Sequence, residues 1–206
     1  MQWTLEYSYA MEKELGKLGN IIVLAGPSGV GKSTIATQLR ARTNLKFVIS
    51  ATTRPPRPGD GQGKVYEHVP HDAFIKRLEA DQFLEYADVY GHYYGTPKQP
   101  VLEALKRGDD VLLEIDVQGA FQVRFQSPGA LLIYIMPPDD DTLLKRLRSR
   151  GADSDADIER RYRLAKRDIW MARGSRAFDL IIFNDDVNHA TTEIIRAIEL
   201  KRKGDL

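Results

Sequence analysis

The sequence predicts an α/β fold in which a parallel sheet is covered by helices on both faces. The first observation is a set of short, almost wholly apolar runs, which are typical of strands buried on both faces. The second is that helical patterns lie between these runs, which implies right-handed crossovers and therefore a parallel sheet. The third is a glycine-rich loop that joins the first apolar run to the first helical pattern.

The predicted elements alternate along the chain. Strands are expected at 21–25, 47–50, 111–115, 130–135 and 179–183. Helices are expected at 33–42, 139–149, 155–173 and 190–203. The first of these helices would turn Ile35, Ala36 and Leu39 toward the sheet, because residues at this spacing share one helix face.

Two stretches interrupt the alternation and divide one predicted domain at 20–206. Residues 53–100 hold many of the prolines and tyrosines in short alternating pieces, which predicts a small mixed β/α lobe inserted between core strands. Residues 141–167 are rich in arginine and predict a small helical lid. The core would then consist of 20–52, 101–140 and 168–206. A polar N-terminal arm is expected at 1–19.

The composition excludes several classes of protein. The formal net charge of the 206 residues is +1, so no overall field favours nucleic acid or an anionic membrane. The absence of cysteine excludes a disulfide scaffold, a cysteine nucleophile and a thiolate metal site. No apolar run approaches the roughly 20 residues that span a bilayer, and the N-terminus lacks a signal-peptide pattern. We therefore expect a cytoplasmic protein that binds neither nucleic acid nor membranes.

The glycine-rich loop is the most specific motif in the chain. Residues 26–33 read Gly-Pro-Ser-Gly-Val-Gly-Lys-Ser and match G-x-x-x-x-G-K-[ST] at every fixed position. Glycines let successive N–H groups converge on phosphate oxygens, and the following helix adds its positive end. Lys32 would reach the β- and γ-phosphates, and the hydroxyl of Ser33 would bind Mg²⁺. The motif therefore predicts a sheet core of the P-loop NTPase type that binds ATP or GTP. The expected nucleotide ligands are Gly26, Pro27, Ser28, Gly29, Val30, Gly31, Lys32, Ser33 and Thr34.

Arg54 and Arg57 indicate a second anion site. They lie in the proline-rich stretch Thr-Thr-Arg-Pro-Pro-Arg-Pro-Gly, directly after a predicted strand. Two guanidinium groups can clamp a phosphate in a bidentate manner, and proline lowers the entropy lost in holding them. An isolated R-x-x-R would more often be a solvated basic loop, but the motifs GKVY, FLEY and GHYYGT follow in the same stretch.

The order of these motifs strongly resembles that of the guanylate kinase family. The likeness runs from about Asn20 to the C-terminus and covers the glycine-rich loop, TTRPPRPG, GKVY, FLEYA, YYGT, LLEIDVQG, RLRSRG and NDD. The resemblance implies an enzyme of purine nucleotide metabolism that transfers phosphate from ATP to GMP, and to dGMP as well, with Mg²⁺ as cofactor. It also implies that the lobe at 53–100 binds GMP.

The resemblance implies roles for individual residues around GMP. Its phosphate would be held by Arg54, Arg57, Tyr66 and Tyr94. Its guanine would be surrounded by Ser50, Glu85, Thr96 and Asp116. Carboxylate acceptors suit guanine because its N1–H and its amino group lie side by side, whereas adenine lacks this donor pair.

Asp116 has a competing role. An acid at the end of an apolar strand is also the usual place for a residue that holds Mg²⁺, so either Glu114 or Asp116 could bind the ion through water. Strand geometry turns both side chains to the same face. The division of base and metal contacts between them stays open.

The lid arginines are expected to act on the phosphoryl group in transfer. Arg146, Arg150 and Arg161 match the family's lid and would offset the charge spread over that group while excluding water. With Lys32 and Arg54 they make up the expected catalytic set. Asn184 matches the family's adenine-side loop. No catalytic base is needed because the GMP phosphate is already an anionic nucleophile, so the histidines are expected to be structural: His68, His71, His92 and His189.

The sequence departs from the family pattern in three places. His92 stands where asparagine is usual, and Glu67 and His68 follow Tyr66 where an aromatic is common. Pro100 falls where the family has an uninterrupted helix, so that helix should either start later here or carry the proline in its first turn. These changes surround the acceptor pocket and leave the preference between GMP and dGMP open.

Two alternative functions remain at this point. The first is a protein-binding module of the same fold without activity, against which the intact Lys32 and Ser33 argue. The second is a P-loop kinase with another small phosphorylated acceptor, against which Glu85, Asp116 and the tyrosines argue. We expect a monomer or a homodimer.

Overall fold

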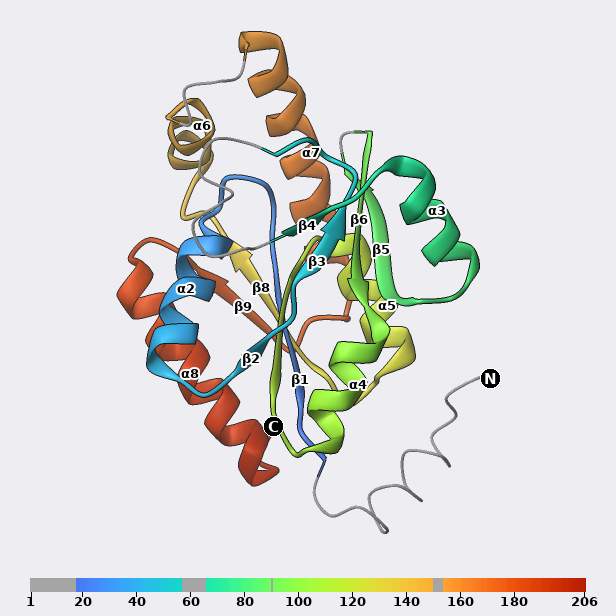
Figure 1. The fold of residues 1–206 in the computed structure, drawn as a ribbon. Helices are drawn as coiled ribbons and strands as arrows, with labels where there is room; N and C mark the ends of the chain where they lie inside the picture. The colour runs from blue at the N-terminus through green and yellow to red at the C-terminus, as the bar shows by residue number, and fades with distance from the viewer. Residues whose placement is uncertain (1–17, 57–65, 90, 150–153) are drawn as a thin grey trace.

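The computed structural model describes residues 18–56, 66–89, 91–149 and 154–206. Arg57, Arg150 and most of the expected N-terminal arm lie outside the described residues. Within them the chain forms two sheets with helices packed around both (Figure 1). No helix in these ranges has both the length and the apolar character that a membrane crossing requires.

The larger sheet is parallel, and the glycine-rich loop lies at the carboxyl ends of its strands. In the described part of the chain its strands follow the order β2-β7-β1-β8-β9 and all pair in parallel. Their bounds are β1 Ile21–Ala25, β2 Lys46–Phe47, β7 Val111–Ile115, β8 Leu131–Met136 and β9 Leu180–Phe183. All residues of β1 and β8 are buried, as expected for strands covered on both faces. The predicted α/β fold is confirmed.

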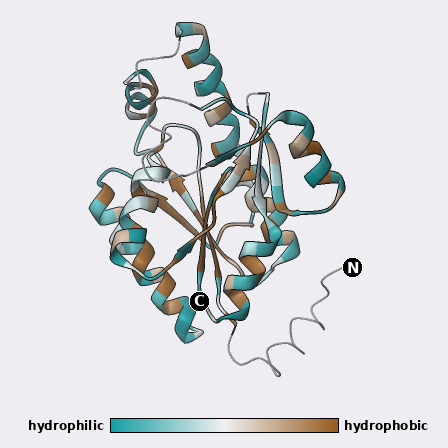
Figure 2. Ribbon diagram, in the orientation of Figure 1, coloured by the Kyte–Doolittle hydropathy of each residue, from teal (hydrophilic) through white to brown (hydrophobic). Residues whose placement is uncertain are grey.

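Helices cover both faces of the parallel sheet (Figure 1). Their bounds are α2 Lys32–Arg42, α4 Lys98–Lys106, α5 Val117–Gln126, α6 Asp140–Arg148, α7 Asp155–Gly174 and α8 Val187–Lys203. On one face α2 and α8 pack against strand residues such as Leu24 and Ile133. On the other, α4, α5 and α7 pack against their neighbours in the strands, such as Val23 and Tyr134. Figure 2 shows the apolar strands between helices whose outer faces are polar.

The smaller sheet forms the inserted lobe. Its strands follow the order β4-β3-β6-β5 in the described residues, with bounds β3 Ser50–Thr52, β4 Tyr66–His68, β5 Phe83–Val89 and β6 His92–Pro97. β3 pairs with β4 in parallel and with β6 antiparallel. Helix α3 (His71–Glu79) covers the sheet through Phe74, whose ring stacks on that of Phe83 at 4.4 Å. The lobe therefore has a small apolar core of its own.

The strand predicted at 47–50 is wrong in one respect, because two strands occupy this region. β2 ends at Phe47 and pairs with β7 of the larger sheet, whereas β3 begins at Ser50 and pairs within the smaller one. The apolar run Phe-Val-Ile is continuous in sequence, so nothing in it indicates that the chain changes sheet there. The prediction for Pro100 is confirmed: α4 begins at Lys98 and carries the proline in its first turn, where the missing N–H has no partner to lose.

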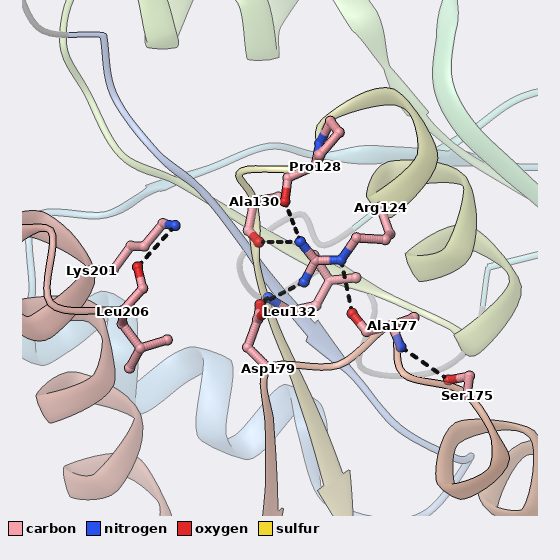
Figure 3. A network of polar contacts seen from close by, with 9 residues as sticks. All are labelled: Arg124, Pro128, Ala130, Leu132, Ser175, Ala177, Asp179, Lys201 and Leu206. Atoms are coloured by element: carbon pink, nitrogen blue, oxygen red, sulfur yellow. Dashed lines mark hydrogen bonds and ion pairs between the residues drawn. The ribbon is translucent and has the colours of Figure 1, made fainter. Parts of the chain in front are cut away.

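Arg124 of α5 joins the two segments that lead into β8 and β9 (Figure 3). Its guanidinium donates to the carbonyl oxygens of Pro128, Ala130 (3.0 Å) and Ala177 (2.9 Å), and to the carboxylate of Asp179 at 2.6 Å. The same carboxylate accepts the N–H of Leu132, the second residue of β8, at 2.8 Å. This network lies at the amino ends of the strands, opposite the edge that carries the glycine-rich loop.

Candidate active site

The glycine-rich loop lies where β1 ends and α2 begins, at the carboxyl edge of the parallel sheet. Gly29 and Gly31 adopt φ angles of 85° and 100°, a backbone region that residues with a Cβ rarely enter. Gly31 directly precedes α2, and its position provides no side-chain cap for the helix. The first N–H groups of α2 are therefore available to bind an anion.

Lys32 and Ser33 form the start of α2. The Lys32 ammonium donates to the carbonyl oxygens of Gly26 (2.6 Å) and Pro27 (3.1 Å), which places it against the loop. The Ser33 hydroxyl donates to a carboxylate oxygen of Glu114 at 2.5 Å, so β7 and the start of α2 meet here. A hydroxyl and a carboxylate are oxygen ligands of the kind that Mg²⁺ prefers. The described residues contain no group of three or more acids or histidines able to hold a metal by themselves, so an ion here would rely on water and phosphate oxygens as well.

Side chains from α6 and α7 support the glycine-rich loop. Arg146 of α6 donates to the carbonyl oxygens of Val30 (3.2 Å) and Asn184 (2.9 Å). Arg161 of α7 is only 7% exposed and donates to the Ser28 hydroxyl at 2.8 Å. Both predicted lid arginines that the structure describes therefore contact the loop or its immediate support.

Asn184 also packs against the loop. Its side chain is 1% exposed, and its Nδ2 donates to the carbonyl oxygen of Val30 at 2.7 Å. A Cβ on Gly31 would lie 2.5 Å from this nitrogen, so the close approach requires glycine. The Oδ1 atom of Asn184 has no hydrogen-bond partner in the described part of the chain. The structure therefore gives Asn184 a bracing contact that sequence reasoning missed, while the adenine contact stays a prediction.

Three of the residues predicted around guanine lie together in the smaller sheet. Glu85 of β5 is 4% exposed and accepts hydrogen bonds from the N–H (3.0 Å) and the hydroxyl (2.5 Å) of Thr96 on β6. The hydroxyls of Thr96 and Ser50 are 3.3 Å apart. Burial raises the pKa of Glu85 to about 7, the Thr96 hydrogen bond opposes the rise, and the charge of Asp116 adds to it. The electrostatic contact with Asp116 brings the fourth predicted residue into the same site.

Glu114 and Asp116 have different surroundings. Glu114 contacts Ser33 at the glycine-rich loop. Asp116 caps α5 by accepting the N–H of Gly119 at 2.8 Å, and it also accepts from the side chain of Gln118 at 3.2 Å. Burial raises the pKa of Asp116, whereas the hydrogen bond from Gly119 and the charge of Lys32 oppose the rise. The charge of Asp116 therefore interacts with both the ammonium of Lys32 and the carboxylate of Glu85.

The predicted phosphate clamp is also assembled, as far as the structure describes it. Arg54 is 7% exposed, and its guanidinium lies 5.8 Å from the ring centre of Tyr66. The ring of Tyr66 meets that of Tyr94 edge to face, with centroids 5.6 Å apart. His68 Nδ1 lies 2.7 Å from the carbonyl oxygen of Arg54, which fixes the backbone of the clamp. This contact gives His68 a structural role, while the expectation that it takes no part in catalysis stays a prediction.

Asp168 is a partly buried acid near the site that sequence reasoning missed. Burial raises its pKa to about 6, the charge of Asp116 adds to the rise, and the charges of Arg167 and Lys32 oppose it. Asp168 follows Arg161 by two helical turns, so both face the same side of α7. The spacing of Arg161 and Asp168 on one helix face was the sequence signal that could have revealed Asp168.

Comparison with known proteins identifies the family of this chain. A family model described as guanylate kinase matches residues 18–201. The chain belongs to the guanylate kinase family. The resemblance recognised in the sequence is thereby confirmed.

Relatives named guanylate kinase match over most of their length. The protein from Synechococcus sp. (strain JA-3-3Ab) is 45% identical over 177 residues, which is 85% of this chain and 80% of that protein. A protein from Thermus thermophilus is 43% identical over 188 residues, which is 91% of this chain and 83% of that protein. A crystal structure of guanylate kinase from Anaplasma phagocytophilum superposes with a TM-score of 0.75 at 29% identity, covering 90% of this chain and 87% of that one.

Proposed function

We propose that this enzyme transfers the terminal phosphoryl group of ATP to GMP, giving ADP and GDP. The observation that supports the proposal is that the described residues form two cationic groupings suited to phosphate. One is the glycine-rich loop with Lys32, and the other is Arg54 beside Tyr66 and Tyr94. Relatives named guanylate kinase, 43–45% identical over most of the chain, support the same reaction.

The acceptor site suits guanine. Glu85 and Asp116 would accept hydrogen bonds from its N1–H and amino group, which adenine does not present side by side. Ser50 and Thr96 would hold the edge of the pocket, since Thr96 already orients the Glu85 carboxylate. Arg54, Tyr66, Tyr94 and the undescribed Arg57 would bind the phosphate.

The donor site would hold the phosphates of ATP and its Mg²⁺. The hydroxyl of Ser33 and the carboxylate of Glu114 would help to hold Mg²⁺, which would supply positive charge to offset the charge that develops during transfer. The contact between Ser33 and Glu114 favours Glu114 over Asp116 as the acid at the metal, because the cap of α5 already engages Asp116. Asn184 would lie on the adenine side, because it follows β9 directly and packs against the glycine-rich loop.

Transfer itself would depend on positioning and charge. Lys32, Arg146 and Arg161 lie around the glycine-rich loop, and the undescribed Arg150 would join them. Guanidinium groups offset the charge on the phosphoryl group in transfer without reacting. The acceptor phosphate is already anionic, so no general base is required. We further propose the core, lobe and lid boundaries stated above, action on dGMP, a cytoplasmic location, and a monomer or homodimer without nucleic-acid partners.

A coupled assay of ADP release tests the proposal. The acceptors to compare are GMP, dGMP, AMP, UMP, CMP and ribose bisphosphate, each with ATP and Mg²⁺. We expect turnover with GMP and dGMP. Turnover confined to a non-guanine acceptor, or none with any acceptor, would contradict the proposal.

A further inference from the structure

Helix α5 makes polar contacts with the inserted lobe that the proposed chemistry does not use. Gln122 accepts the backbone N–H of Tyr86 at 3.1 Å and donates to the carbonyl oxygen of the same residue at 2.6 Å. Gln126, one helical turn later, donates to the carbonyl oxygen of Leu84 at 2.8 Å. β5 is the edge strand of the smaller sheet in the described residues. The two glutamines therefore pair with the free edge of β5 much as a further strand would.

Glu85 lies between the two backbone positions that α5 holds. Leu84 and Tyr86 turn backbone groups outward to α5, and Glu85 lies opposite Thr96 of β6. The register of β5 against β6 shifts between Phe83 and Glu85, an irregularity of the β-bulge kind that re-aims a side chain. The glutamine contacts thus hold the strand on both sides of the residue whose carboxylate enters the guanine site.

Gly119 leaves the space that the carboxylate fills. A Cβ on Gly119 would clash with Glu85 Oε2 and would lie 3.0 Å from its Cδ. The carboxylate is 4% exposed, and Thr96 holds its other oxygen through two hydrogen bonds. An added methyl group would therefore displace Glu85 from Thr96.

The same helix also holds the second acid. Asp116 is the N-cap of α5 and accepts the N–H of Gly119 at 2.8 Å. One face of α5 thus contacts both acids of the guanine site: Asp116 through the helix cap, and Glu85 through Gly119 and the strand it lies on.

We propose that Gly119, Gln122 and Gln126 are positioning residues for guanine recognition, which hold Glu85 at a fixed place relative to Asp116. They act through these acids and do not touch the substrate. The inference rests on the proposed function, in which Glu85 accepts hydrogen bonds from guanine.

The main test replaces both glutamines by methionine, which keeps the length of the side chains but removes their donors and acceptors. We expect the double variant Gln122→Met, Gln126→Met to raise KM for GMP about tenfold, the effect of losing roughly one net hydrogen bond in free energy. KM for ATP should stay unchanged. IMP lacks the amino group of GMP, so its KM should rise less and the preference for GMP over IMP should fall. The matched control is Gln99→Met, an exposed glutamine of α4 that should leave every parameter unchanged.

A second variant keeps the inference testable if the double variant does not fold. Gly119→Ala retains both glutamines, and alanine forms helix more readily than glycine. It should reproduce the selective rise in KM for GMP. Unchanged KM for GMP in both variants, or an equal rise in KM for ATP, overturns the inference.

Glu85→Gln separates failure of the inference from failure of the proposed function. If this variant binds GMP normally, Glu85 is not a guanine ligand and both proposals fall together. If it binds GMP weakly while the α5 variants bind it normally, only the positioning role of α5 is wrong.

Discussion

Glu85 is almost fully buried, so its protonation state decides whether its carboxyl group donates or accepts hydrogen bonds. Its pKa is raised to about 7, first by burial and further by the charge of Asp116, despite the hydrogen bonds from Thr96. Below this pH the carboxyl group carries a proton and has less acceptor capacity, whereas above it both oxygens accept. Guanine presents donors here, so binding of GMP should release a proton when the pH lies below the pKa of Glu85.

We therefore predict that KM for GMP falls as the pH rises through the pKa of Glu85, by up to about tenfold per pH unit on the acid side. The phosphate of GMP titrates in the same range, so the measurement is the difference between the wild-type profile and that of Glu85→Gln. Parallel profiles would contradict the prediction. The pKa in the folded protein lies above the ordinary 4.5, so the contribution of Glu85 to the free energy of unfolding should fall as the pH rises from 4.5 to about 7.

Lys32→Ala should abolish turnover. The ammonium group lies against the loop where the phosphates of ATP would bind, and its charge is needed as negative charge develops there. We expect kcat to fall at least about 1,000-fold, the equivalent of roughly 4 kcal/mol. Unchanged activity in a folded variant would refute the role of the glycine-rich loop.

Arg54→Ala should act on the acceptor side. The guanidinium is nearly buried beside Tyr66, where its bonds to a phosphate would be shielded from water. We expect KM for GMP to rise roughly 10- to 100-fold, as for the loss of a charge-assisted hydrogen bond, with KM for ATP unchanged. An effect confined to ATP would mean that the two phosphate sites are assigned the wrong way round.

At the scale of elements, α5 contacts two parts of the molecule that have different roles. Its N-terminal turn caps on Asp116 of the proposed guanine site and Gln122 bonds the backbone of β5, whereas Arg124 at its last turn joins the entries to β8 and β9 (Figure 3). The Arg124 side chain is 23% exposed, which lowers the weight of its ion pair with Asp179.

Arg124→Met should therefore lower stability without changing substrate binding. We expect a loss of about 2 kcal/mol in the free energy of unfolding, measured by urea denaturation, since several carbonyl groups lose a charged donor. KM for both substrates should stay at the wild-type value below the melting temperature, because the network lies at the far end of the strands. A change in KM with unaltered stability would contradict this assignment.

At the scale of the whole molecule, the fold and most of the site are predictable from sequence for different reasons. The parallel sheet is predictable because strands buried on both faces are apolar throughout, and the glycine-rich loop because its spacing is tied to phosphate geometry. The change of sheet after Phe47 is not, since an apolar run is compatible with either sheet. The helix at α5 is also hard to predict, because Gly119 and its glutamines break the apolar spacing of a buried helix. Gly119 and the glutamines are explained by their contacts with β5. Contacts between segments that are far apart in the sequence leave no local pattern.

The contact of Lys32 with its own loop decides how the molecule presents its charge. The carbonyl oxygens of Gly26 and Pro27 accept hydrogen bonds from the ammonium group, so the backbone itself holds the cation against the loop. Part of the side-chain entropy that a flexible lysine would lose on binding a phosphate is therefore already lost on folding, which leaves more of the attraction for the ligand.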